Sequence, residues 1–225
     1  KVIESMAEIC KNNGVKFLLE EEVTKINIFN KTVKSVTTKT QELLANFVVG
    51  AADYVHIESK LIDKKYQNYN AEYWENREFS PSALLFYLGV NKKIRNLEHH
   101  TLFFDEDMEK LSQEIYDTKV WPEKPLFYTC CPAKSEENLA PKGKENLFIL
   151  MPITSGLEDT EELREKYFKI IIKRLEIYCK QDILTNIEYK KSYCIKNFEE
   201  DYFSYKGNAY GLANTLLQTA NLKPI

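Results

Sequence analysis

Residues 82–90 read SALLFYLGV and residues 146–153 read NLFILMPI, and these two runs decide the fold. Each is apolar almost throughout and has the length of a strand, a pattern typical of strands that are buried on both faces. Pro152 is compatible with a strand only because it lies near the end of its run. The sequence therefore predicts two central strands, with residues 126–131 and 188–194 as neighbouring strands.

A long helix is predicted to lie across this sheet. Apolar side chains recur at helical spacing from Leu163 to Tyr178, and Asp159 with Glu162 offers a capping pair where that helix begins. Shorter helical patterns cover residues 105–116 and 209–220. The combination predicts an α+β fold, in which a mixed, largely antiparallel sheet is covered by helices.

The first sixty residues follow a different order. The sequence predicts a helix over residues 2–10, a short strand at 15–19, a hairpin that turns at Asn30-Lys31 and a buried strand at 47–49. A small-residue turn, GAAD at 50–53, and a helix over 56–62 follow. We place a domain boundary near residue 55.

Composition limits the classes of function. The chain has 225 residues, of which 44% are hydrophobic and 29% charged, as expected of a globular protein with a substantial core. The formal net charge is −3 and the signs are mixed along the chain, so we do not expect nucleic acid as a partner. No apolar run reaches the length of about 20 residues that crosses a bilayer.

Residue types argue against several chemistries. The five cysteines show no CxxC spacing, which favours a reduced, cytoplasmic setting, and adjacent Cys130 and Cys131 fit packing better than a redox pair. Because adjacent histidines in a strand point to opposite faces, His99 and His100 do not suggest a chelate, and we expect no metal. The chain contains no GxGxxG, no Walker motif and no GxSxG, so neither a complete dinucleotide site nor a hydrolase is supported.

Two segments leave alternatives open. Gly207 and Gly211, four residues apart, allow a ligand or another backbone to approach closely, and plain helix packing explains them equally well. The run FEEDY at 198–202 sets carboxylates beside aromatic rings, and a carboxylate next to apolar surface can be tuned for proton transfer, but a solvated charged turn is the commoner reading.

Several long segments, taken in order, resemble one family. They are GAADY at 50–54, WENREFSPSALLFYLGV at 74–90, HHTLFF at 99–104, WPEKPLFYTCCP at 121–132, LAPKGKENLFILMPITSGLED at 139–159 and KGNAYGLANT at 206–215. The chain is similar in these segments to the carotenoid desaturases of the phytoene-desaturase type and to related flavin-dependent polyene saturases and isomerases.

The resemblance implies the substrate domain of a flavin amine oxidase-like fold. Residues 1–55 would be a partial FAD-binding domain and residues 56–225 the substrate-binding domain. The glycine-rich FAD motif and a second flavin-contacting segment would lie outside both ends of the chain, so we expect an interior fragment that is inactive and retains little FAD.

The resemblance also implies an activity. FAD in the full-length parent would take a hydride from a long apolar polyene held in a tunnel, and the parent would attach peripherally to a membrane surface from the cytoplasm. The implied cofactor contacts are Val23, Ala51, Ala52 and Asp53. The implied tunnel residues are Phe86, Tyr87, Gly207, Tyr210 and Gly211. Asp201 is our candidate for the proton acceptor or for a group that steadies charge.

Two other functions stay open at this point. A saturase or isomerase of polyenes or retinoids would have the same fold, because these segments do not fix the direction of electron flow. A stand-alone module that binds an apolar ligand or a partner protein belongs to a different class.

Overall fold

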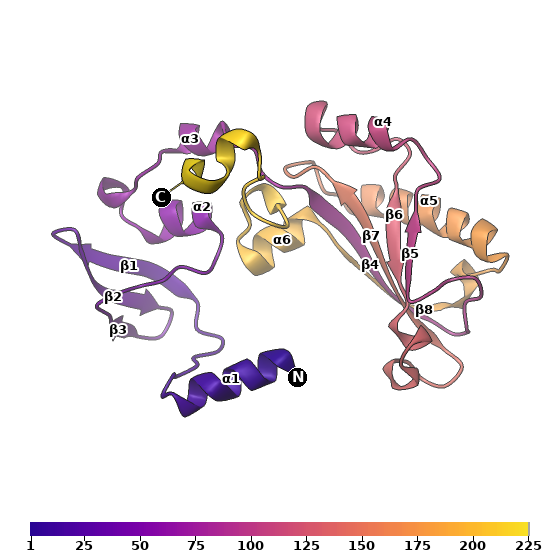
Figure 1. Cartoon of the computed structure of the whole chain (residues 1–225), viewed down its shortest axis with the longest axis horizontal. Coiled ribbons are helices and arrows are strands. Elements are labelled where there is room, and N and C mark those ends of the chain that lie inside the picture. The colour runs from indigo at the N-terminus through magenta and orange to yellow at the C-terminus, as the bar shows by residue number, and fades with distance from the viewer. Residues whose placement is uncertain (225) are drawn as a thin grey trace. The chain divides into compact units, whose positions relative to one another are not determined.

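The computed structural model describes residues 1–224, which form two compact units (Figure 1). The first unit comprises Lys1–Ala51 and Ile57–Ala71, and the second comprises Ala52–His56 and the chain from Glu72 onward. The boundary expected near residue 55 falls in the short stretch that belongs to the second unit. The assignment of the two units to flavin and polyene is a proposal and is taken up below.

The first unit is small and contains a three-stranded antiparallel sheet. Its elements are α1 (Val2–Asn12), β1 (Val23–Phe29), β2 (Thr32–Thr38), β3 (Glu42–Leu44), the π-helix η1 (Ile57–Leu61) and the 3-10 helix η2 (Lys64–Tyr66). The predicted helix and hairpin are confirmed, and the hairpin turns through positive φ at Asn30 and Lys31. The strands predicted at 15–19 and 47–49 are wrong, since neither segment joins the sheet and Phe47 and Val49 are 90% and 92% exposed.

The second unit is built on a five-stranded sheet in the order β5-β6-β7-β4-β8. The strands are β4 (Ser82–Val90), β5 (His100–Phe103), β6 (Phe127–Cys130), β7 (Glu145–Ile153) and β8 (Ile187–Tyr193). All neighbouring pairs are antiparallel, and β4 and β7 lie inside the sheet. The predicted α+β class and the two central strands are confirmed.

Several helices belong to the second unit. They are α2 (Tyr54–His56), α3 (Ala71–Glu75), α4 (Met108–Ser112) with the π-helix η3 (Gln113–Asp117), α5 (Glu161–Cys179) and α6 (Ile195–Tyr202). The helices predicted over 56–62, 105–116 and 163–178 are thus present. Among the described residues, none of these helices has the length and apolar character needed to cross a bilayer.

The core lies between the sheet and α5, which runs along one face of the sheet (Figure 1). Alternate strand residues point to this covered face, so β7 shows a strict alternation of buried and half-buried positions. Phe86 of β4 packs against Phe168 of α5 with ring centroids 5.2 Å apart, beside Ile149 and Leu175, which are 0% exposed. We refer to this surface as the covered face.

The start of α5 differs from the predicted capping pair. Thr160 is the N-cap, and its Oγ1 accepts a hydrogen bond of 3.2 Å from the Leu163 N–H. Asp159 instead binds Arg164 with both carboxylate oxygens. The capping pair of Asp159 and Glu162 is therefore wrong, because a buried arginine one turn into the helix claims the aspartate.

The final helix predicted over 209–220 is also wrong. The segment runs extended beside residues 78–81: the Ala209 N–H donates to the Pro81 carbonyl at 3.1 Å, and the Ser80 N–H donates to the Gly211 carbonyl at 2.8 Å. Gly211 has φ +78°, which interrupts any helix there. In the part of the chain that the structure describes, two 3-10 turns follow, Leu216–Gln218 and Ala220–Leu222.

Candidate functional site: the open face of the sheet

The second face of the five-stranded sheet, opposite α5, carries an aromatic surface. Directly paired residues of antiparallel strands share a face, so the pairing register assigns its members. We define this open face by Leu85, Tyr87, Gly89, His100, Leu102, Tyr128, Cys130, Asn146, Phe148, Leu150, Tyr189, Lys191 and Tyr193. All five strands contribute to it.

Rings cover the middle of the open face. Tyr87 of β4 and Phe148 of β7 have centroids 5.2 Å apart, and Phe148 meets Tyr128 of β6 at 6.3 Å. Tyr87 is 42% exposed, whereas Phe148 and Tyr128 are half-buried. A row of accessible rings on a rigid sheet suits an elongated apolar ligand, because such a ligand gains most from apolar contact area.

Helix α6 places polar groups at one edge of this surface. The Tyr193 hydroxyl lies 2.9 Å from Asp201 Oδ2 and 3.0 Å from the Asn197 carbonyl oxygen, and its ring meets Phe198 edge-on at 5.0 Å. Burial and the hydrogen bond to Asp201 raise the pKa of Tyr193 above its ordinary range. The hydroxyl is therefore neutral at pH 7 and serves as a donor to the carboxylate.

Asp201, the predicted proton acceptor, sits beside this aromatic surface on an exposed part of α6. Its carboxylate accepts a bond from Tyr193 and has further lone pairs. The chemistry of a base is thus present, and its use in a reaction stays a proposal. Tyr87, whose pKa is raised by burial and by the nearby Tyr202, is neutral as well.

The two strand residues expected to line a tunnel separate in the structure. Tyr87 belongs to the open face, but Phe86 points to the covered face and is 1% exposed under α5. Adjacent residues of one strand cannot line the same cavity. Phe86 therefore packs the core, and Tyr87 alone carries the expectation of a ligand contact.

The other three expected tunnel residues, Gly207, Tyr210 and Gly211, have different surroundings. Gly207 lies against Ile195, where an added Cβ would come within 2.6 Å of a side-chain carbon, whereas Gly211 has free space around it. Tyr210 is 83% exposed and lines a pocket of about 570 Å³ between residues 77–81, 115–119, 154–157 and 212–215. The three residues therefore do not gather at one point of a tunnel wall.

Asn208 anchors that run, and sequence reasoning missed it. It is 1% exposed; its amide donates to the Tyr205 carbonyl at 2.8 Å and to Asp53 Oδ2 at 3.3 Å, and its oxygen accepts from the Gly211 N–H at 2.5 Å. The sequence does contain a signal for this role: Asn208 stands between a glycine and an alanine, and asparagine in such a setting often bonds to the backbone of a turn. Its bonds hold the turn, so Asn208 has a structural role.

The predicted cofactor contacts do not make a flavin pocket by themselves. Asp53 is engaged by the His56 N–H at 3.1 Å, the Tyr205 N–H at 3.3 Å and the Asn208 amide. Ala51 and Ala52 are exposed, and Val23 is half-buried at the start of β1. These residues offer backbone groups and one carboxylate that already holds three donors, so they do not fit a complete FAD site.

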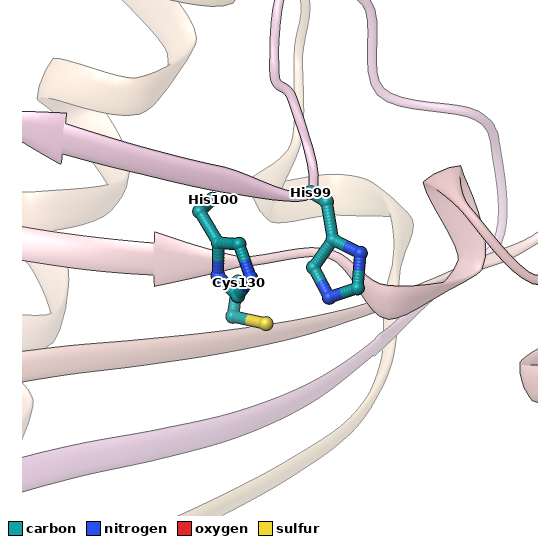
Figure 2. Close-up of side chains that lie close together, drawn as sticks. All are labelled: His99, His100 and Cys130. Atoms are coloured by element: carbon teal, nitrogen blue, oxygen red, sulfur yellow. The ribbon is translucent and has the colours of Figure 1, made fainter.

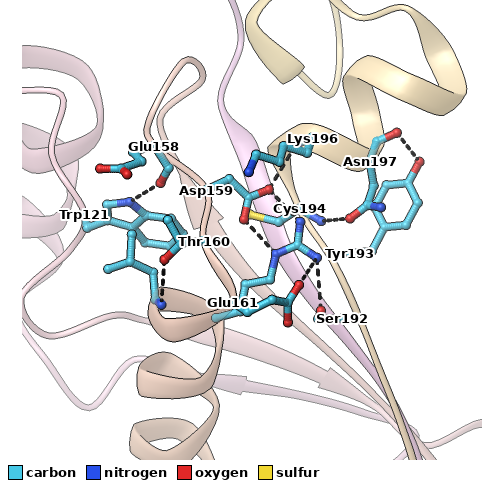
Figure 3. A network of polar contacts seen from close by, with 12 residues as sticks. Trp121, Glu158, Asp159, Thr160, Glu161, Ser192, Tyr193, Cys194, Lys196 and Asn197 are labelled. Carbon is cyan, nitrogen blue, oxygen red and sulfur yellow. Dashed lines mark hydrogen bonds and ion pairs between the residues drawn. The ribbon is translucent and has the colours of Figure 1, made fainter.

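A buried ion pair lies at the start of α5, at the edge of the core (Figure 3). Arg164 donates from Nε and Nη2 to the two oxygens of Asp159, both at 2.6 Å, and from Nη1 to Ser192 Oγ at 3.1 Å. The Lys196 N–H donates to Asp159 Oδ2 at 3.0 Å. Burial alone would raise the pKa of Asp159, but the bonds from Arg164 and the Lys196 N–H hold it below its ordinary value.

The buried cysteines are inert. Burial raises the pKa of Cys131 and Cys194 to about 12 and that of Cys179 to about 11, so these thiols stay protonated at pH 7. Cys131 lies in the core, as its packing role predicts, while its neighbour Cys130 belongs to the open face. All five cysteines are free.

Two solved structures share the fold of this chain. The chain superposes on an oxidoreductase from Methanosarcina mazei with a TM-score of 0.54 at 13% identity, over 86% of this chain and 41% of the other. It superposes on the PF1083 protein of Pyrococcus furiosus with a TM-score of 0.52 at 20% identity, over 85% of this chain and 41% of the other. These likenesses show the fold alone.

The sequence comparison finds named desaturases along the whole chain. The chain is 35% identical over 99% of its length to a carotenoid 3,4-desaturase of Haloarcula japonica, and 29% identical over its full length to a 4,4'-diapophytoene desaturase of Methylomonas sp. It spans 45% of each relative. No family model matches the chain. This chain is a homologue of the carotenoid desaturases, and the resemblance predicted from its segments is confirmed.

Proposed function

We propose that this chain forms the polyene-binding part of an FAD-dependent carotenoid desaturase. The observation that carries the proposal is the similarity to named desaturases along practically the whole chain, which includes the strands of the open face. The aromatic open face supports it, because an acyclic carotenoid is long, apolar and rich in π-electrons. In this assignment the first unit contributes part of a flavin-binding domain and the second unit binds substrate.

Desaturation removes a hydride and a proton from adjacent carbons of the polyene and leaves a new carbon–carbon double bond. FAD, when bound, supplies the hydride acceptor. The second unit would hold the polyene against the rings of Tyr87, Tyr128 and Phe148 and keep water from it. Asp201 would take the proton, with the Tyr193 hydroxyl stabilising its carboxylate.

The test is to express the complete coding sequence that contains these residues in cells that accumulate 4,4'-diapophytoene or another acyclic carotenoid. Products with more conjugated double bonds, identified by chromatography and by absorption at longer wavelength, are expected. A polyene that loses double bonds, or only changes geometry, would instead identify a saturase or an isomerase. Unchanged polyene in the presence of folded, flavin-loaded protein would refute the proposal.

A matched pair of variants locates the substrate. Tyr87→Asp sets a charge among the rings of the open face, and we expect at least a ten-fold fall in product, since an apolar ligand would then have to desolvate a carboxylate. Leu184→Asp, at a residue of similar exposure in a turn after α5, should leave product unchanged. Equal loss in both variants would remove the open face from the proposal.

We also propose that the protein attaches peripherally to a lipid surface. An apolar area at the β5 edge of the sheet supports this: it surrounds a pocket of about 470 Å³ beside α5, shares Leu102 with the open face, and leaves Leu102, Phe104 and Ile177 each more than 60% exposed. Exposed apolar area of this kind is typical of proteins that contact a partner or a bilayer. Flotation with phospholipid vesicles should be lost in Phe104→Asp and retained in Leu184→Asp.

A further inference from the structure

Two histidines and one cysteine meet at the end of the open face (Figure 2). His99 directly precedes β5, His100 is its first residue, and Cys130 is the last residue of β6 and the pairing partner of His100. One ligand atom from each of the three side chains lies within 4.8 Å of the others. In Figure 2 the Cys130 sulfur projects into the space beside the two rings.

This arrangement corrects the expectation that adjacent histidines diverge. His99 lies outside the strand, so the alternation of strand side chains does not apply to it. The two imidazole rings are stacked, with centroids 4.2 Å apart and planes inclined by 28°. The backbone at this point is tied to β6, because the Cys131 N–H donates to the His99 carbonyl at 2.8 Å.

Each ring already has the outer contact that metal-binding histidines make. His99 Nδ1 lies 2.7 Å from Ser135 Oγ, and His100 Nδ1 lies 2.5 Å from the Tyr128 hydroxyl. When Nδ1–H donates to these oxygens, the proton is fixed on Nδ1 and Nε2 presents its lone pair. Histidine ligands of metals are oriented in this way by a hydrogen bond from the other ring nitrogen.

We propose that His99, His100 and Cys130 form a binding site for a thiophilic divalent transition-metal ion of the zinc type. Two imidazole nitrogens and one thiolate are the donor set that zinc prefers, whereas calcium and magnesium require oxygen ligands. His100 is exposed and the other two are half-buried, so an ion reaches the site from solvent and water completes its shell. This proposal is independent of the desaturase activity.

The geometry needs only a small closure. Zinc–nitrogen bonds of about 2.0 Å and zinc–sulfur bonds of about 2.3 Å set tetrahedral donors roughly 3.3–3.7 Å apart. The three donor atoms, within 4.8 Å of one another, therefore have to approach by about 1 Å, which rotation about side-chain bonds provides. A bound ion would link the start of β5 to the end of β6.

The experiment is a titration of the purified, reduced protein with Zn²⁺, followed by calorimetry, and with Co²⁺, followed by visible absorption. We expect one equivalent of each ion, and for Co²⁺ the ligand-field bands of a tetrahedral site together with a thiolate-to-metal charge-transfer band. Cys130→Ser should abolish the charge-transfer band and weaken zinc binding by at least about 100-fold. Cys10→Ser and His56→Gln, which change a cysteine and a histidine elsewhere, are the matched controls and should bind as the wild type does.

Ser135→Ala separates a built site from a chance cluster. It leaves all three ligands in place and removes only the partner of His99 Nδ1, so zinc affinity should fall about ten-fold with the charge-transfer band retained. Far-ultraviolet circular dichroism and the urea midpoint establish that each variant is folded. If the folded wild type binds no zinc, or if Cys130→Ser binds it as tightly as the wild type, the proposal is overturned.

Discussion

The two faces of the five-stranded sheet are made by the same strands and have opposite properties. On the covered face Leu84, Ile149 and Met151 are fully buried beneath α5. On the open face Tyr87 stays accessible among other rings, and the polar groups there include the neutral Tyr193 hydroxyl, the Asp201 carboxylate and exposed Lys191, which pairs with Tyr87. Because side chains alternate along each strand, residues that stabilise the fold lie on one face and residues that are accessible to a ligand lie on the other.

The difference shows where function can change without loss of the fold. A substitution on the covered face acts on close-packed side chains and leaves a cavity, whereas a substitution on the open face acts on a surface. The proposals for polyene and for metal both lie on the open face. Paired substitutions, one on each face, test this division.

Phe86→Ala against Tyr87→Ala is the sharpest test of the division, because the two residues are adjacent in β4. Phe86→Ala should lower the free energy of unfolding by about 3–5 kcal/mol, since it removes a ring packed against Phe168. Tyr87→Ala, at a residue 42% exposed, should lower it by about 1 kcal/mol. Urea unfolding of both variants measures the difference, and equal losses would show that the open face is as closely packed as the covered face.

The buried ion pair between Asp159 and Arg164 is expected to contribute to stability at the edge of the covered face. Asp159→Asn should destabilise by about 3 kcal/mol, because it leaves the Arg164 guanidinium buried without its charge partner. Glu161→Gln is the matched control: Glu161 lies 3.6 Å from the same guanidinium but its side chain is 83% exposed, so the loss should stay below about 0.5 kcal/mol.

The same pair predicts a dependence on pH. The pKa of Asp159 is held below its unfolded value of about 3.9. Its contribution is therefore fully present above that pH and is lost as the pH falls through the lower, folded value. The difference in unfolding free energy between wild type and Asp159→Asn should be constant from neutral pH to about pH 5 and should shrink in stronger acid. A difference that grows in acid would contradict this cause.

A third pair of substitutions, at Gly207 and Gly211, tests how closely the segment from 207 to 211 is packed. Gly207→Ala should cost about 2–4 kcal/mol, since φ is +61° and the new Cβ would meet Ile195, the first residue of α6, at 2.6 Å. Gly211→Ala, also at positive φ but in open space, should cost about 1 kcal/mol. Thermal unfolding would rank them, and an equal cost would mean that contact with Ile195 does not limit the position.

The sequence predicted the elements whose signal is local. The apolar runs at 82–90 and 146–153 and the stripe of α5 gave the central strands and the main helix, since a strand or helix that must bury a face carries that periodicity itself. The wrong elements depend on distant partners. Residues 209–213 look helical locally but pair with residues 78–81, about 130 positions earlier in the chain.

The candidate site could be predicted in part. Tyr87 and Asp201 came from the family resemblance, but the resemblance could not tell Tyr87 from Phe86, because that distinction needs the strand's register against α5. The cluster of His99, His100 and Cys130 was missed since it depends on where β5 begins, and a shift of one residue changes which side chains converge.

A small expected effect on stability concerns the polar edge of the open face. Tyr193→Phe removes one hydrogen bond to Asp201 and should lower the free energy of unfolding by about 1 kcal/mol at pH 7. Because the folded pKa of Tyr193 is raised, that contribution is present below about pH 10, the unfolded value, and declines as the pH rises further.

Asp201→Asn keeps an acceptor but removes the charge, so in a spectrophotometric titration the pKa of Tyr193 should return toward its ordinary value. Stability should then hardly change, and if Asp201 accepts the proton, desaturation should nevertheless fall by a factor of at least about 100. A variant that keeps full activity while the Tyr193 titration shifts would leave Asp201 with an electrostatic role toward Tyr193 and none in the reaction.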